Sequence, residues 1–282
     1  MIPATELAPE SPPIYEPPPP DPSFWCGVWI AIKLQLIPII VILPAAIAGI
    51  SLHRKLHEHP AVVLIGSVVA SAWVIRSYCR ESGVSVMDLA GPLLFPPKLL
   101  LALAAGAIGL ILLEIPLALQ LMVRFPFLDP KMDFGVDQSP FAAFLLIVIA
   151  APLTEEIIYR GILLRGFAPR YGALRAAIAA GAIFSMAHVF PIRLPGMFIV
   201  GFLLSCVFLR IGSIWPGVLA HAFNNATAFL FMLQQPQPAP QQALQQLGPW
   251  ATPCLVAGAV LLATAILAGR RVLSNSPRLA VP

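Results

Sequence analysis

Long apolar runs separated by short polar breaks make up most of the chain. Eight such runs can be drawn, each long enough or nearly so to cross a bilayer as a helix, which takes about 20 residues. The breaks carry charged residues, prolines and glycines, as at residues 53–60 and 168–172. This pattern predicts an all-α fold, a polytopic membrane helical bundle with about eight transmembrane helices. The runs lie near residues 28–52, 61–79, 98–123, 140–166, 173–190, 194–210, 214–232 and 250–269.

The order of the runs also predicts the organisation of the chain. Residues 1–24 are rich in proline, a composition typical of a disordered, polyproline-like tail. A Gln- and Pro-rich stretch before the last run is predicted to be a polar loop. The predicted parts are a tail over 1–24, N-terminal transmembrane helices over 25–139, a helical core over 140–232, a polar loop over 233–249, a last transmembrane helix over 250–270 and a second tail over 271–282.

Composition supports a membrane protein and excludes some partners. Of the 282 residues, 59% are hydrophobic and 11% are charged, and a soluble protein of this length cannot bury so much apolar side chain. The net charge of +4 is small and spread over the loops. It provides no basic patch for nucleic acid, so no nucleic-acid partner is expected. The four cysteines lie far apart, without the spacing of a metal site, and are interpreted as buried thiols.

Lysines and arginines fall unevenly between the two sets of loops. With the N-terminus inside, the inner loops hold most of them, which is the usual bias of cytoplasmic loops. The sequence therefore predicts an integral, multi-pass protein of the plasma (inner) membrane with both termini in the cytoplasm.

Two adjacent glutamates and an arginine interrupt the fourth run. A charged side chain at membrane depth costs about 2.5–3.5 kcal/mol on insertion scales, so it should face a protein interior or a wet cavity. Glu156 and Arg160 are four residues apart with the acid first, an order that favours an ion pair on a helix. Glu155 points about 100° away and has no local cation. We interpret Glu156 as structurally paired and Glu155 as free for chemistry.

Two later runs carry polar groups at helical spacing. Phe184 and His188 share one face of the fifth run, and His221 and Asn225 share one face of the seventh. One intramembrane histidine alone would be interpreted as an interhelical hydrogen bond. Several such groups in neighbouring runs indicate a site that activates water. Glu155 would be the general base beside His188, and His221 and Asn225 would donate to the oxyanion that forms on a peptide carbonyl.

These motifs resemble those of the CAAX protease and bacteriocin-processing (CPBP) family, an intramembrane group that includes the type II CAAX prenyl endopeptidases. The family has Glu-Glu-x-x-x-Arg, Phe-x-x-x-His and His-x-x-x-Asn on successive core helices. Here they are Glu155-Glu156…Arg160, Phe184…His188 and His221…Asn225, and Tyr159 stands where the family often has Phe. The resemblance covers roughly residues 140–232.

The resemblance implies that residues 140–232 are the catalytic core of a glutamate-dependent endopeptidase, a hydrolase within the membrane. Glu155 would act with His188, while His221 and Asn225 would form the oxyanion pocket. Glu156, Arg160 and Phe184 would support them. The expected partners are membrane lipid and a peptide or lipidated protein substrate.

A metal is left open by the resemblance, because the family has also been described as metal-dependent. Glu155, His188 and His221 would then be the candidate ligands of a divalent ion such as zinc, since one Glu and two His can leave an open position. No pair has the H-E-x-x-H arrangement, which favours a site without metal.

Two other classes of function compete with the protease. A non-catalytic scaffold or bacteriocin-immunity protein would use the same cavity only to bind. A transporter or proton relay would also use intramembrane Glu and His. Against transport, the polar groups cluster at one depth, and the two halves of the chain show no paired broken helices.

Overall fold

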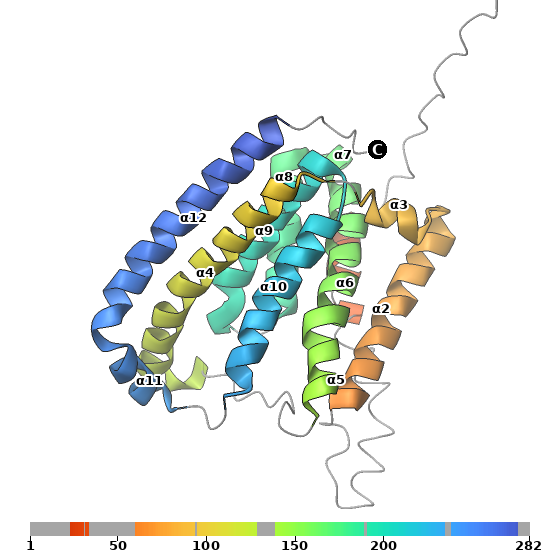
Figure 1. Cartoon of the computed structure of the whole chain (residues 1–282). Coiled ribbons are helices and arrows are strands. Elements are labelled where there is room, and N and C mark those ends of the chain that lie inside the picture. Colours follow the sequence, from red (N-terminus) through yellow and green to blue (C-terminus); the bar gives the residue numbers. More distant parts are fainter. Residues whose placement is uncertain are drawn as a thin grey trace, which may run out of the picture.

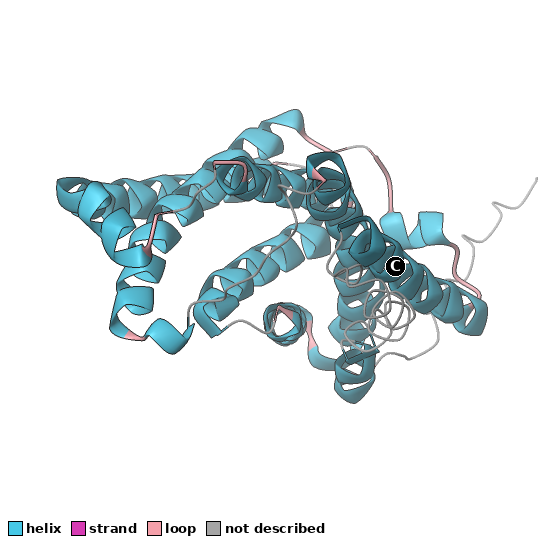
Figure 2. Ribbon diagram, turned by 90° about the horizontal axis from the view of Figure 1, so that it is seen from below, coloured by secondary structure: helices cyan, strands magenta, loops and turns pink. Residues whose placement is uncertain are grey.

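The computed structural model describes residues 23–30, 32–33, 60–93, 95–128, 139–188, 191–234 and 238–275 (Figure 1). Within these residues all regular structure is helical, which confirms the predicted fold class, and a second view shows only helices joined by loops (Figure 2). Residues 24–30 and 32–33 are also helical. The main elements are α2 (Pro60–Ser82), α3 (Val86–Ala90), α4 (Pro97–Arg124), α5 (Pro140–Phe144), η3 (Leu145–Ala150), α6 (Ala151–Glu156), η4 (Ile157–Leu164), α7 (Arg165–Tyr171), α8 (Ala173–Ala187), α9 (Leu194–Ile211), α10 (Trp215–Met232), α11 (Pro240–Leu247) and α12 (Ala251–Ser274).

Five helices of the described residues are long and apolar enough to cross a membrane. The fifth predicted run forms a shorter apolar helix, Ala173–Ala187. The seventh run is helical as α10 but is not among the five, and most of the run 28–52 lies outside the described residues. The predicted count of about eight is therefore not confirmed. The five are Ala61–Ser82, Pro97–Arg124, Pro140–Tyr171, Pro191–Ile211 and Pro240–Ser274.

The predicted loop over 233–249 is partly wrong, because it contains α11. Pro240 occupies the first turn of α11, where its fixed φ suits a helix and its missing N–H costs nothing. Ala243, Leu244 and Leu247 then recur at helical spacing, and α11 packs against α4. The last helix also runs on to Ser274, four residues into the predicted tail. Residues 1–22 and 276–282 of the predicted tails lie outside the described residues.

One long helix carries the glutamates through the centre of the bundle. It runs without a break from α5 through η3, α6, η4 and α7, and ends at Gly172 with a φ of 77°. The stretches η3 and η4 are π-helical, and such wide turns are frequent at functional sites. Every residue of η4 is buried, and α2, α3, α7, α8 and α9 pack against it. The glutamates at the end of α6 are therefore held on a rigid, buried helix.

The short helix α3 closes one end of this core. Ser85 caps it: its Oγ accepts from the N–H of Asp88 and donates to that carboxylate, which also accepts from the N–H of Ser85. These hydrogen bonds from the side chain and the backbone of Ser85 hold the pKa of Asp88 below its usual value. Behind the cap, Leu89 packs directly on Gly161 of η4, where a Cβ would lie 2.9 Å from the Leu89 carbonyl oxygen.

Candidate active site

Glu156 and Arg160 form a buried ion pair at the centre of the long helix. Nη1 of Arg160 donates to Oε1 of Glu156 at 2.8 Å, and both side chains are 1% exposed. The predicted pairing of these two residues is thus confirmed. Nη2 of Arg160 donates to the carbonyl oxygen of Gly201 at 3.1 Å, and the guanidinium lies over the Phe184 ring, 4.8 Å from its centroid. A carboxylate, a backbone carbonyl and an aromatic ring therefore surround one buried cation.

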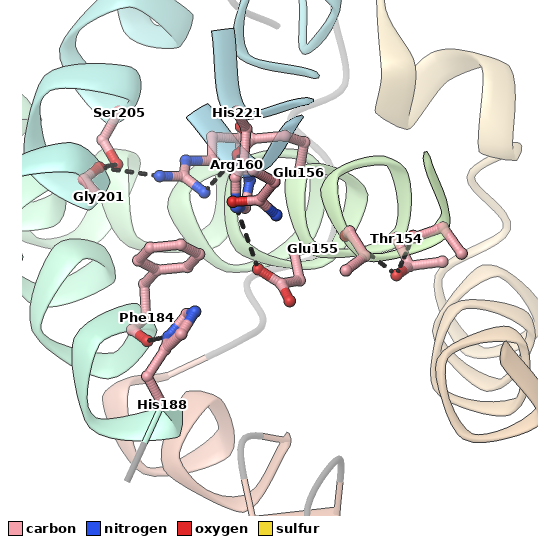
Figure 3. Close-up of polar contacts among 12 residues, drawn as sticks. Thr154, Glu155, Glu156, Arg160, Phe184, His188, Gly201, Ser205 and His221 are labelled. Atoms are coloured by element: carbon pink, nitrogen blue, oxygen red, sulfur yellow. Dashed lines mark hydrogen bonds and ion pairs between the residues drawn. The ribbon is translucent and has the colours of Figure 1, made fainter. Parts of the chain in front are cut away.

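His221 lies beside both carboxylates (Figure 3). Its Nδ1 is 3.3 Å from Oε1 of Glu156, and its Nε2 is 3.8 Å from Oε2 of Glu155. Gly217, one turn earlier on α10, makes this approach possible, because a Cβ there would lie 2.6 Å from Oε2 of Glu156. Helix α10 thus brings an imidazole between two acids that belong to another helix.

The two glutamates differ in their access to water. The side chain of Glu155 is 27% exposed, whereas that of Glu156 is 1% exposed and bound by Arg160. One oxygen of Glu155, Oε2, is buried and has no hydrogen-bond partner within the described residues. A buried carboxylate oxygen without a donor is costly unless water or a ligand supplies one. Oε2 of Glu156 is also without a partner among the described residues, so the two glutamates differ in that only the Glu155 side chain combines an open acceptor with partial exposure.

His188 ends α8 and is oriented by its own helix. Its Nδ1 lies 2.8 Å from the carbonyl oxygen of Phe184. Because a carbonyl can only accept, Nδ1 carries the proton and Nε2 stays available to a ligand. The Phe184 ring touches both imidazoles, at 4.8 Å from the centroid of His188 and 5.7 Å from that of His221.

Glu155 and His188 are not joined directly. Among the described residues, no hydrogen bond or ion pair links the Glu155 carboxylate to the His188 ring. Figure 3 shows the ring turned toward the side on which Glu155 lies. Catalytic hydrogen bonds are often long before substrate binds, and a gap of this kind suits a bridging water. The imidazole in contact with Glu155 is that of His221 instead.

Asn225 is fixed by the wide turn η3. Its Nδ2 donates to the carbonyl oxygen of Ile147 at 2.9 Å. Ile147 lies in η3, and its partner five residues on in the π-helical register would be Pro152, which has no N–H, so the Ile147 carbonyl is open to a side-chain donor. An amide nitrogen has two hydrogens, so one N–H of Asn225 stays available. His221 and Asn225 both come from α10, as predicted, but the first turns to the glutamates and the second to η3.

The comparison with protein families identifies this part of the chain. Residues 137–227 match the family model described as type II CAAX prenyl endopeptidase Rce1-like. The chain carries an Rce1-like domain. The domain spans less than half of the 282 residues and contains every predicted site residue from Glu155 to Asn225. No curated protein and no solved structure is significantly similar to the chain. The match confirms the resemblance drawn from the motifs, and with five apolar helices it indicates an integral membrane protein of the CAAX protease type.

The donors of the Rce1-like domain do not fit a three-ligand metal site in this arrangement. Within the described part of the chain, no three His, Cys, Asp or Glu side chains are close enough to hold one ion. His188 keeps Nε2 free for a ligand, but both nitrogens of His221 face carboxylates. A catalytic zinc needs three protein ligands that converge on one point. We therefore derive no step through a metal, and a metal-free site stays a prediction.

Sequence reasoning missed the backbone support of the site. The Gly201 carbonyl accepts from Arg160 and also from Ser205 Oγ at 2.7 Å. Gly201 lies against Gly181 of α8: a Cβ on Gly201 would lie 3.0 Å from the Gly181 Cα and from Phe184 Cδ1. Small residues at this helix crossing let α9 approach closely enough to bind Arg160. A hydroxyl and a glycine in an apolar run give too weak a signal to be found without coordinates.

A second intramembrane acid was also missed. Glu114 of α4 packs against Gly196 in the first turn of α9 and interacts electrostatically with Arg193. An acid in the middle of the run 98–123, far from Lys98 at its start, would have been the signal. Glu114 has no contact with Glu155 or His221 among the described residues, so it stands apart from the site.

Proposed function

We propose that the protein is an intramembrane endopeptidase that hydrolyses a peptide bond near the membrane surface with a water activated by Glu155. The observation that supports this most strongly is the contrast between the two glutamates. Each has one buried oxygen, Oε2, without a hydrogen-bond partner among the described residues, but the Glu156 side chain is 1% exposed and neutralised by Arg160, whereas the Glu155 side chain is 27% exposed. An acid that accepts a proton must reach water, and Glu155 meets that requirement.

In the proposed reaction Glu155 accepts a proton from a water molecule as the water oxygen attacks the carbonyl carbon of the peptide. Nε2 of His188, left free by the bond from Nδ1 to Phe184, would hold that water on its other side. The carbonyl oxygen becomes an oxyanion and would accept from the second N–H of Asn225. The C–N bond then breaks, and the proton on Glu155 passes to the leaving amine.

His221 has a supporting role in this scheme. A neutral imidazole donates through one nitrogen only, whereas the protonated ring donates through both. With a carboxylate on each side, the ring fixes the orientation of Glu155 relative to the buried Glu156–Arg160 pair. When Glu155 takes up the proton of water, the ring can also move toward the oxyanion.

Substrate class follows from the family at a coarse level. The matched family is described as prenyl endopeptidases, so we propose a lipidated or membrane-bound polypeptide cleaved near its C-terminus. We place the protein in the plasma (inner) membrane with both termini in the cytoplasm, on the distribution of Lys and Arg. Fusion of a periplasmically active phosphatase to the C-terminus tests the orientation: activity of the fusion would contradict it.

The decisive experiment is cleavage by purified protein in lipid nanodiscs. The probe is a fluorogenic peptide with a farnesylated cysteine three residues before its C-terminus, assayed with and without 1,10-phenanthroline. Cleavage that persists with the chelator supports the metal-free mechanism, and cleavage that the chelator abolishes contradicts it. Peptide that is bound but never cleaved would instead favour the non-catalytic scaffold.

A further inference from the structure

An apolar cavity lies between α4, α9, α10 and α12, and His221 is one of its lining residues. Its volume is about 280 Å³, and it is partly open to the outside. Figure 1 shows α4 and α12 running side by side along one flank of the bundle, and these two helices pack together over much of their length. Nothing in the proposed hydrolysis uses this space.

Small residues on two facing helices keep the cavity open. Gly106 of α4 and Gly269 of α12 both line it. A Cβ on Gly106 would meet only the Ala265 Cβ at 3.6 Å, and one on Gly269 only the Ala102 Cβ at 3.9 Å. At Gly109 the same helices are closer still, since a Cβ there would lie 2.8 Å from the backbone of Leu262. The cavity therefore lies beside the α4–α12 contact, on the side of α9 and α10, and a Cβ on Gly106 or Gly269 would meet only a side-chain atom.

The walls and their depth indicate a hydrocarbon occupant. Most lining residues are leucine, valine, alanine and glycine, and α4, α9 and α12 are all among the apolar helices able to cross a membrane. The polar side chains of the lining are Asn224, His221 and Arg270, and away from these three the walls do not offer the two to four polar partners that a water molecule needs. An unfilled gap forfeits the dispersion contacts of its lining. At membrane depth the available filler is a lipid chain.

The two ends of the cavity differ in chemistry. Arg270, an exposed residue in the last turns of α12, lines one end. His221 lines another part of the wall, and because both of its nitrogens face carboxylates, its carbon edge remains for the cavity. A cation at a membrane surface attracts anionic headgroups, and the predicted orientation puts this end of α12 at the cytoplasmic leaflet.

We propose that this cavity binds one acyl chain of an anionic phospholipid, with the phosphate at Arg270 and the chain extending toward the carbon edge of His221. The bound lipid belongs to the bilayer and is distinct from the cleaved substrate. An acyl chain in this position would pack behind the imidazole of His221, which contacts Glu155. Binding of the lipid is independent of the proposed peptidase activity, whereas any effect of the lipid on turnover rests on it.

Native mass spectrometry of the detergent-purified chain tests the binding directly, with phosphatidylglycerol or phosphatidylcholine added. The filling variant is Gly106→Leu/Gly269→Leu, which places leucine side chains into the cavity without a backbone clash. The control is Ala259→Leu, on an exposed position of α12 that does not line the cavity. We expect the apparent Kd for phosphatidylglycerol to rise about tenfold or more in the filling variant, since each excluded methylene loses roughly 0.8 kcal/mol. The control should bind like the natural chain.

Arg270→Gln separates the contribution of the lipid headgroup from that of the acyl chain. We expect this variant to lose the preference for phosphatidylglycerol over phosphatidylcholine but still to bind the acyl chain. Equal retention of phosphatidylglycerol by the filling variant and the natural chain would overturn the site. Equal retention of both lipids by the natural chain would overturn the anionic assignment. If the natural chain retains the lipid but does not cleave the peptide, this result would count against the proposed function and not against the lipid site.

Discussion

His221 Nδ1 lies 3.3 Å from Glu156 Oε1, the same oxygen that Arg160 binds at 2.8 Å. This shared oxygen links the site to the bundle in one chain of contacts. The Gly201 carbonyl holds Arg160, Arg160 holds Glu156, and Glu156 faces the imidazole whose other nitrogen faces Glu155. The position of the proposed base therefore depends on backbone atoms of α9, although Glu155 and Gly201 lie far apart along the chain.

Glu155→Gln should abolish peptide cleavage while leaving the fold intact. The amide keeps the shape of the carboxylate but cannot take a proton from water, and loss of a general base costs about 10²–10⁴-fold in kcat. Glu155 is 27% exposed and, unlike Glu156, is not bound by Arg160, so thermal unfolding in detergent should change little. Measured cleavage within a few fold of the natural chain would exclude Glu155 as the base.

Glu156→Gln is the matched comparison, since it makes the same chemical change one residue away. Here the main expected effect is on stability, because Arg160 loses its counter-charge in a site that is 1% exposed. Glu155→Gln and Glu156→Gln should thus separate cleanly: the first lowers kcat at constant thermal stability, and the second lowers the unfolding temperature. Identical profiles for the two variants would contradict the division of roles.

Arg160→Ala should destabilise the protein by about 3–5 kcal/mol, the usual cost of leaving one buried charge without its partner. The double variant Glu156→Gln/Arg160→Met removes both charges and should recover part of the loss. The stability of Arg160→Lys should lie between those of the natural chain and Arg160→Ala, because an ammonium cannot donate in a fork to Glu156 and Gly201 together. Chemical or thermal unfolding in detergent micelles measures all three. A double variant less stable than Arg160→Ala would argue against an ion pair as the source of the effect.

The fold class and the buried Glu156–Arg160 pair could be predicted from the local sequence pattern alone. Apolar runs predicted helices, and the spacing of Glu156 and Arg160 predicted a contact within one helix, where geometry is fixed by the 3.6-residue period. The Glu155–His188 partnership required the relative rotation of two helices. Periodicity does not supply that rotation: it comes from the Gly181–Gly201 crossing and from the π-helical turns, which shift the helix register.

The errors have a similar origin. A Gln-rich composition hid α11, whose helical register only becomes stable where Leu244 and Leu247 can pack on a neighbour. The motif spacing placed His221 and Asn225 on one face of α10, but their partners, Glu156 and Ile147, lie about two and a half turns apart on another helix. Which side chain of a shared face meets which partner is decided by packing between helices.

Gly201→Ala should lower both stability and turnover. The added methyl would lie 3.0 Å from the Gly181 Cα and from Phe184 Cδ1, so α9 must shift and its carbonyl must retreat from Arg160. Overpacking of this kind costs about 1–3 kcal/mol. Gly106→Ala is the control, because its methyl meets only Ala265 at 3.6 Å and should be neutral or stabilising. A drop in kcat at unchanged KM, together with a shifted pH profile, would show that the effect passes through the Arg160–Glu156–His221 contacts.

Asn225→Ala should slow cleavage by about 10²–10³-fold, the range found when one oxyanion donor is removed. The same change deletes the hydrogen bond to the Ile147 carbonyl, which alone is worth about 0.5–1.5 kcal/mol of stability, so a rate effect and a stability effect are expected together. Asn225→Asp separates them, because a carboxylate keeps the size of the amide but cannot donate to either oxygen. Its negative charge beside a forming oxyanion should make turnover slower than in Asn225→Ala. Turnover restored toward the natural rate by Asn225→Asp would mean that side-chain volume, and not donation, is what position 225 supplies.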